Sequence, residues 1–102
     1  MTTKSKGARS FLEAKVGPLT IGKFLMSIRL GEKISQVGFA HKLNISKSHL
    51  CDIEQNRKSV SPERAVKFAK ILGYSPEQFV RLALQGVLDR EGLHMTVSVQ
   101  AA

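Results

Sequence analysis

The apolar positions between about residue 20 and residue 92 recur every three or four residues, which is the spacing of amphipathic helices. A Ser or Thr that can cap an N-terminus precedes each of five such stretches, and a Gly or Asn lies near each end. The caps and approximate ends are Thr20 to Leu30, Ser35 to Asn44, Ser46 to Asn56, Ser61 to Gly73 and Ser75 to Gly92. The pattern predicts an all-α domain of five helices.

The last two helices share a start signal, in which a capping serine is followed by proline and glutamate at residues 61–63 and 75–77. Proline suits the first helical position, and the acid faces the positive end of the helix dipole. Ser75 and Gln78 are also predicted to form a capping box. The apolar residues of the last helix cover more than one face, which predicts a second buried surface such as a subunit contact.

After Gly92 the period of the pattern changes from that of a helix to that of a strand. Leu93, Met95, Val97 and Val99 alternate with polar residues. The alternation predicts a short C-terminal β-strand, which in a helical chain needs a partner strand from a second copy or from a different protein. A frayed tail is the alternative.

The stretch from residue 35 to residue 54 carries the most specific pattern, two short helices joined by a tight turn. Ala40 is small where the two helices meet, and Asn44 is one of the few residues other than glycine that adopts a positive φ at low cost. Ser46 supplies the cap of the second helix. This is the spacing of a helix-turn-helix.

The second helix of the pair has one apolar face and one polar face. The apolar residues of both helices and the turn between them are expected to join a common core, namely Phe39, Leu43, Ile45, Leu50 and Ile53. The residues expected to face outward are Lys47, Ser48, His49, Cys51 and Asp52. An exposed helix face with cationic and hydroxyl groups at its N-terminal end fits the major groove of DNA.

The side chains around this helix suggest distinct DNA contacts. Lys47 is predicted to reach guanine O6 or N7, Ser48 either type of base, and Asp52 a cytosine amine. Gln36 is predicted to bind a phosphate at the start of its helix. The full predicted DNA-binding set is Gln36, Ser46, Lys47, Ser48, His49, Asp52, Arg57 and Lys58.

Some residues of this region have plainer interpretations. Arg57 and Lys58 are either backbone clamps or a solvated turn, and His49 is either a phosphate contact or an ordinary surface histidine. Cys51 is expected to be an inert thiol. Glu54 is expected to hold the domain together through an internal ion pair rather than to touch DNA.

The composition favours a polyanionic partner. The 102 residues include 16 Lys and Arg against 8 Asp and Glu, a formal net charge of +8. Residues 19–60, which contain the helix-turn-helix pattern, carry seven basic and three acidic side chains, whereas residues 61–102 carry five and four. A generally solubilising charge is the alternative interpretation.

The residue inventory argues against several other classes. One cysteine excludes an internal disulfide framework, no apolar run is long enough for a membrane span, and the basic N-terminus lacks the apolar region of a secretory signal. Three scattered histidines do not form a zinc ligand set, and no nucleophile with a base or phosphate-binding glycine loop is evident. We therefore expect a cytoplasmic, nucleoid-associated protein of the bacterial cytosol that is not an enzyme and has no cofactor, metal or membrane partner.

The sequence divides into three parts. Residues 1–18 are polar and basic with one apolar patch, Phe11, Leu12 and Val16, and are predicted to be a flexible arm. Residues 19–92 are predicted to form the helix-turn-helix domain, and residues 93–102 the C-terminal strand or tail.

Residues 19–92 resemble the lambdoid-repressor-like, five-helix class of helix-turn-helix domains, also called XRE-type. Gln36, Ala40, Leu50 and Ile53 stand where that class has its phosphate-binding glutamine, its small residue and its core pair. Asn44 departs from the glycine usual in the family. More narrowly, the segments 51–54, 60–62, 73–75, 78–82 and 88–92 resemble HigA-type antitoxins of type II toxin-antitoxin systems.

The narrower resemblance implies a homodimeric transcriptional repressor that binds a double-stranded DNA operator and neutralises a ribonuclease toxin encoded beside it. The arm would fold onto the toxin through Phe11, Leu12 and Val16. Two alternatives remain open from the sequence: a stand-alone phage-like repressor without a toxin, and a protein-bridging adaptor with the same fold.

Overall fold

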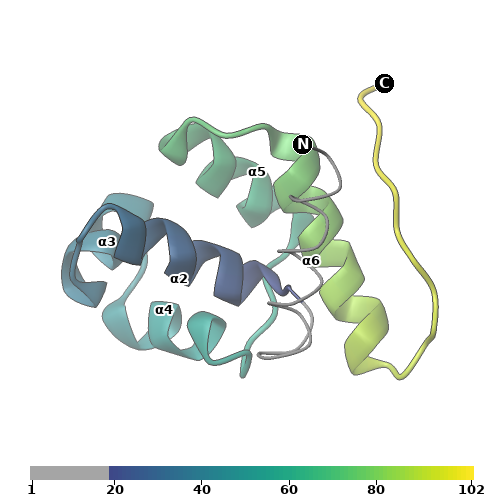
Figure 1. Ribbon diagram of the computed structural model, residues 1–102, viewed down its shortest axis with the longest axis horizontal. Coiled ribbons are helices and arrows are strands. Elements are labelled where there is room, and N and C mark those ends of the chain that lie inside the picture. Colours follow the sequence, from purple (N-terminus) through teal and green to yellow (C-terminus); the bar gives the residue numbers. More distant parts are fainter. Residues whose placement is uncertain (1–18) are drawn as a thin grey trace, which may run out of the picture.

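The computed structural model describes residues 19–102, so the predicted arm and its apolar patch lie outside the described residues. Five helices occupy this part of the chain (Figure 1). They are α2 (Ile21–Gly31), α3 (Gln36–Leu43), α4 (Lys47–Glu54), α5 (Pro62–Leu72) and α6 (Pro76–Arg90). The all-α prediction with five helices is confirmed for residues 19–102.

Four of the five predicted N-caps form as expected. The side-chain oxygens of Thr20, Ser35, Ser46 and Ser61 each accept a hydrogen bond from the backbone N–H three residues later, at 3.0 to 3.1 Å. The capping box predicted at Ser75 is wrong, because its hydroxyl makes no cap bond. That hydroxyl instead donates a hydrogen bond at 2.9 Å to the Glu77 carboxylate, an ionised acceptor only two residues away.

One apolar core holds the five helices together. Its largest fully buried side chains are Phe39, Phe68, Phe79, Leu25, Leu50, Ile53 and Val60. α5 packs along α6, α3 packs on α4, and α2 contacts both α4 and α6. The helix-turn-helix pair is therefore fixed to the rest of the domain through α2 and α5.

Gly22 marks the closest approach between α2 and α4. A Cβ atom built on this glycine would overlap the carbonyl oxygen of Ile53 and lie 2.9 Å from its carbonyl carbon. Only a residue without a side chain lets the backbone of α2 lie this close to the end of α4.

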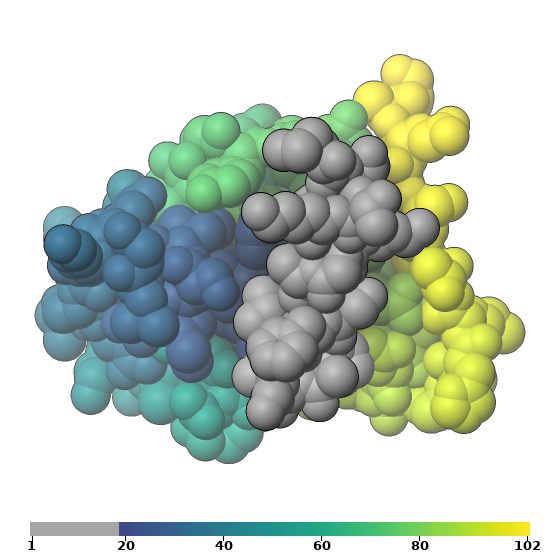
Figure 2. All heavy atoms as spheres, viewed as in Figure 1, coloured from purple at the N-terminus to yellow at the C-terminus, as the bar shows by residue number. Residues whose placement is uncertain are grey.

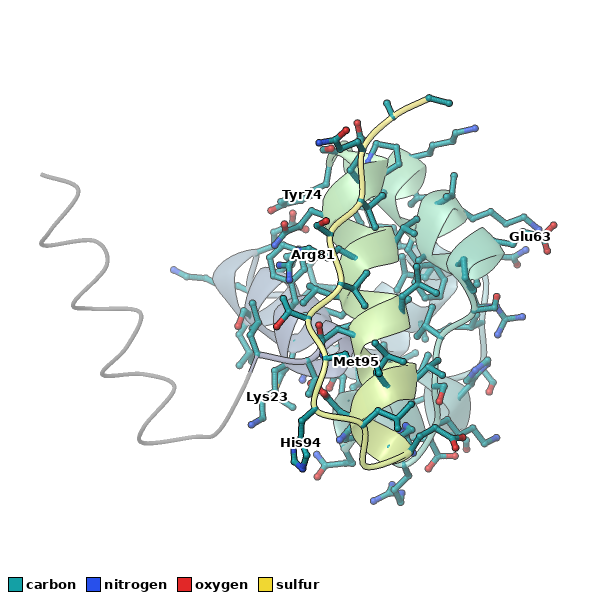
Figure 3. All side chains as sticks on the ribbon, turned by 90° about the vertical axis from the view of Figure 1, so that its right-hand side faces the viewer. Lys23, Glu63, Tyr74, Arg81, His94 and Met95 are labelled. Carbon is teal, nitrogen blue, oxygen red and sulfur yellow. The ribbon has the colours of Figure 1, made fainter. Side chains whose placement is uncertain are left out.

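The C-terminal strand predicted for residues 93–99 is wrong, since these residues form no strand. They run in an extended path alongside α6 (Figure 3). The Gln85 side chain on α6 donates to the carbonyl oxygen of Met95 at 2.8 Å and accepts from the N–H of Val97 at 2.9 Å. A β-strand forms only when its backbone hydrogen-bonds to the backbone of a neighbouring strand. Here the side-chain amide of Gln85 supplies the hydrogen bonds instead, and it reaches only two backbone groups, those of Met95 and Val97.

The helix-turn-helix pair and the C-terminal segment lie toward different ends of the molecule. In Figures 1 and 2, α3 is at one end of the long axis and the C-terminal residues are at the other.

No helix among residues 19–102 has the length and apolar character needed to cross a membrane.

Candidate DNA-binding surface

The turn between α3 and α4 has the geometry that the sequence predicts. Asn44 lies in the left-handed region with φ 61° and ψ 44°. Its N–H donates to the carbonyl of His41 at 3.1 Å, and the N–H of Ile45 donates to Ala40 at 3.0 Å. Ala40 is buried at the crossing. Asparagine therefore replaces the usual glycine of the turn without disturbing its hydrogen bonds.

α4 is buried on one face and open on the other. Leu50 and Ile53 are completely or almost completely buried, which fixes the rotation of the helix about its axis. Lys47 and Ser48, in its first turn, are exposed. The predicted outward orientation of these two residues is confirmed. Ser46 is also exposed, but its oxygen accepts from the N–H of His49 as the helix cap.

A buried carboxylate connects α4 to α2 and α3. The side chain of Glu54 is fully buried and accepts two hydrogen bonds from Arg29, at 2.8 and 3.1 Å. The Gln36 amide donates a third, at 2.9 Å. The hydrogen bond to Glu54 raises the pKa of the Arg29 guanidinium, although its partial burial opposes this. The predicted internal ion pair of Glu54 is confirmed, and it also positions Gln36 at the start of α3.

Three residues predicted to contact DNA separately are joined by ion pairs. The Asp52 carboxylate accepts from Arg57 Nε at 2.9 Å and lies 3.6 Å from Lys58 Nζ. The hydrogen bond from Arg57 is the main reason why the pKa of Asp52 lies below its usual range. Lys47 and Ser48 share with Asp52 and Arg57 a shallow hollow of about 180 Å³. The two cations thus offset the negative charge of Asp52 beside the exposed start of α4.

Arg64 is a neighbour of α4 that the sequence analysis missed. Its Nη1 atom lies 3.1 Å from both ring nitrogens of His49, so the first turn of α5 is placed against α4. Partial burial, followed by the positive charges of Arg64 and Lys58, lowers the pKa of His49 below 6.5. No local signal pointed to Arg64, because fifteen residues separate the pair along the chain.

This environment predicts that His49 makes the fold sensitive to mild acid. Because its pKa is lowered in the folded protein, the unfolded chain binds a proton at this residue more readily, and stability must fall as the pH drops below about 6.5. Urea unfolding of the wild type between pH 7.5 and 5, a range that spans the ordinary titration of histidine, should show a steeper loss of stability than that of His49→Gln. Equal slopes for the two proteins would contradict the expectation.

Comparison with known proteins is consistent with this geometry. Residues 25–79, from within α2 to the first turns of α6, match the family model described as "Helix-turn-helix". The chain belongs to the helix-turn-helix family. This confirms, at the level of the family, the resemblance to lambdoid, XRE-type domains.

One relative is similar over about half of the chain. An "Immunity repressor protein" of Bacillus phage phi105 is 38% identical over 55 residues, which is 54% of this chain and 38% of that protein. The chain therefore spans well under half the length of this relative. No solved structure matches the chain.

The family consists of non-enzymatic DNA-binding domains, so the prediction that the chain is not an enzyme is confirmed for the matched residues. Among residues 19–102, no three His, Cys, Asp or Glu side chains are grouped so that they could hold a metal ion. The groups on this surface that can bind a ligand are its cations and its hydrogen-bonding side chains.

Proposed function

We propose that this chain is a sequence-specific DNA-binding transcriptional repressor that acts as a homodimer. The observation that carries the proposal is the exposure of Lys47 and Ser48 at the start of α4, a helix whose opposite face is locked into the core. The similarity of 55 residues of the chain to a phage protein named as an immunity repressor supports the regulatory role. The site of action implied is the DNA of a bacterial cytosol.

In this proposal α4 enters the major groove with its N-terminal end. Lys47 donates to guanine O6 or N7, and Ser48 bonds either type of base. Gln36, held by Glu54 at the start of α3, donates its remaining amide hydrogen to a phosphate, aided by the positive end of that helix.

The cluster of Asp52, Arg57 and Lys58 then has two roles. The cations hold phosphates on either side of the groove, while their ion pairs reduce the repulsion between Asp52 and the DNA backbone. Asp52 keeps acceptor capacity for a cytosine amine, because a carboxylate has more lone pairs than Arg57 and Lys58 use.

A homodimer would place two copies of α4 in successive major grooves, about 34 Å apart along the DNA. A surface suited to the subunit contact is the outer side of α6 with the segment that follows it. Val87, Leu93 and Met95 expose 41%, 43% and 61% of their surface there, and apolar patches of this kind are typical of interfaces.

The test of direct readout is the double substitution Lys47→Ala with Ser48→Ala. We expect the ratio of affinities for an operator, obtained by in vitro selection, and a random duplex to fall by about 30-fold or more, since each of the two base contacts contributes about 1–3 kcal/mol of discrimination. Fluorescence anisotropy titrations with both duplexes measure the ratio. Lys58→Ala is the control, and it should weaken binding to both duplexes alike and lower the salt slope by about one. An unchanged ratio in the double variant would reject readout by these residues and favour the protein-bridging adaptor.

The further role as an antitoxin rests on the resemblance of segments 51–54, 60–62, 73–75, 78–82 and 88–92 to HigA-type proteins. In that role the chain represses its own operon and neutralises a ribonuclease toxin through Phe11, Leu12 and Val16, which lie outside the described residues. Pull-down of the product of the adjacent gene, with and without residues 1–18, tests it. Undiminished capture by the truncated chain would remove the arm from the toxin interface.

A stand-alone, phage-like repressor fits the DNA-binding evidence equally well, and the phage relative favours it. In that case residues 1–18 follow the DNA backbone, and their removal lowers the salt slope of DNA binding. The antitoxin role predicts no such change, so one titration series separates the two.

A further inference from the structure

A hollow of about 380 Å³ lies between the turn after α3 and the outer face of α5, and we call it the α5 hollow. Its floor is apolar and consists of Leu43, Ile45, Phe68 and Ile71. Ile71 exposes 42% of its surface, so part of this floor is open to solvent. The volume is in the range of sites that accept a small ligand or a few side chains of a partner.

Three cations form the rim of the α5 hollow. Arg64, Lys67 and Lys70 recur every third residue of α5 and are all exposed. The ion pairs found among residues 19–102 use other cations: Arg29 with Glu54, Lys42 with Glu32, and Arg57 and Lys58 with Asp52. The rim therefore presents positive charge beside an apolar surface without a neutralising carboxylate from the described residues.

The combination favours a protein segment over the DNA backbone as the occupant. Phosphates would satisfy the cations but would leave the apolar floor exposed to water. A peptide with a bulky apolar side chain between carboxylates satisfies both, because its side chain covers the apolar floor while its acids reach the cations of the rim, Arg64, Lys67 and Lys70.

We propose that the α5 hollow is a docking site for a partner protein segment in which acidic residues flank one bulky apolar side chain. The site is separate from Lys47 and Ser48, so the inference does not depend on the proposed DNA readout. It is nevertheless connected to α4, because Arg64 lines the hollow and contacts His49.

That connection gives docking a measurable signature. A carboxylate that pairs with Arg64 reduces the positive charge next to His49, and this charge is one of the causes that lower the pKa of the imidazole. Occupation of the α5 hollow should therefore raise the pKa of His49 toward its ordinary value.

The test is an NMR titration of the full, isotope-labelled chain without DNA. The probe is a blocked pentapeptide with a central phenylalanine and two acidic residues on each side. The control peptide has amides in place of the four acids. We expect saturable shifts at residues 43–45 and 64–71, a rise in the pKa of His49, and binding of the control about five- to tenfold weaker. Lys67→Gln should weaken the acidic peptide about two- to fivefold, whereas the matched exposed change Lys33→Gln in the α2–α3 loop should not.

Three results would overturn the proposal. The first is the absence of shifts in the α5 hollow with peptide at about 5 mM, a level that detects dissociation constants of a few millimolar. The second is equal binding of the acidic and amide peptides. The third is a salt slope of duplex DNA binding that falls by about one in Lys67→Gln, which would assign the rim to phosphates instead. Because the peptide titration contains no DNA, failure here and failure of the proposed DNA readout are distinguishable.

Discussion

Replacing Glu54 by glutamine is expected to lower the free energy of unfolding by about 3–5 kcal/mol, because it leaves the Arg29 guanidinium without its counterion. Arg29 exposes 14% of its side chain and Glu54 none, so water cannot replace the lost partner fully. Domains of this size are stable by only about 5–15 kcal/mol, so the loss is a large fraction of the total. Urea unfolding followed by circular dichroism measures it.

A matched control is available on the surface. The Lys42–Glu32 pair is 42% and 41% exposed and separated by 3.5 Å, so Glu32→Gln should change stability by less than about 1 kcal/mol. The double variant Arg29→Met with Glu54→Met should recover much of the loss, since it removes both buried charges together. A small effect of Glu54→Gln, similar to that of Glu32→Gln, would show that the buried pair is not what fixes α4 to α2.

Gly22→Ala is expected to destabilise the fold by about 2–3 kcal/mol, although alanine is the better helix former by about 1 kcal/mol. The new methyl group would overlap the carbonyl of Ile53, and backbone atoms cannot move aside as a flexible side chain does. α2 must then shift away from the end of α4. Thermal and urea unfolding of the two proteins measure the difference.

Gly86 on α6 provides the control for this substitution. A Cβ atom added there meets nothing within 4 Å, so Gly86→Ala should stabilise the protein by about 0.5–1 kcal/mol through helix propensity alone. Opposite signs for the two glycines would confirm that steric overlap at the α2–α4 crossing is decisive. A gain in stability from Gly22→Ala would show that this crossing adjusts without cost.

Much of the candidate site was predictable because its determinants are local. The caps at Ser35 and Ser46 act over three residues, and Asn44 closes the turn through its own backbone conformation. The helical spacing of Leu50 and Ile53, three residues apart on one face of α4, is sufficient to orient Lys47 and Ser48 outward.

The two errors arose where a local pattern was overruled by another hydrogen bond. Alternation after Gly92 is typical of a strand, but pairing needs a second strand, and in the structure the Gln85 amide binds the segment instead. At Ser75 the capping pattern was present, but the hydroxyl donates to the nearby Glu77 carboxylate and accepts no cap bond.

By itself the amino-acid sequence determined the five helices, the tight turn and the polar face of α4, because periodicity and capping act within one or two turns of a helix. Only the tertiary structure decided the bonds between Glu54 and Arg29, 25 residues apart, and between Arg64 and His49, 15 residues apart. It also decided that Gly22 lies against Ile53. Such contacts form only when the core packs, and local sequence patterns do not specify which surfaces the packing brings together.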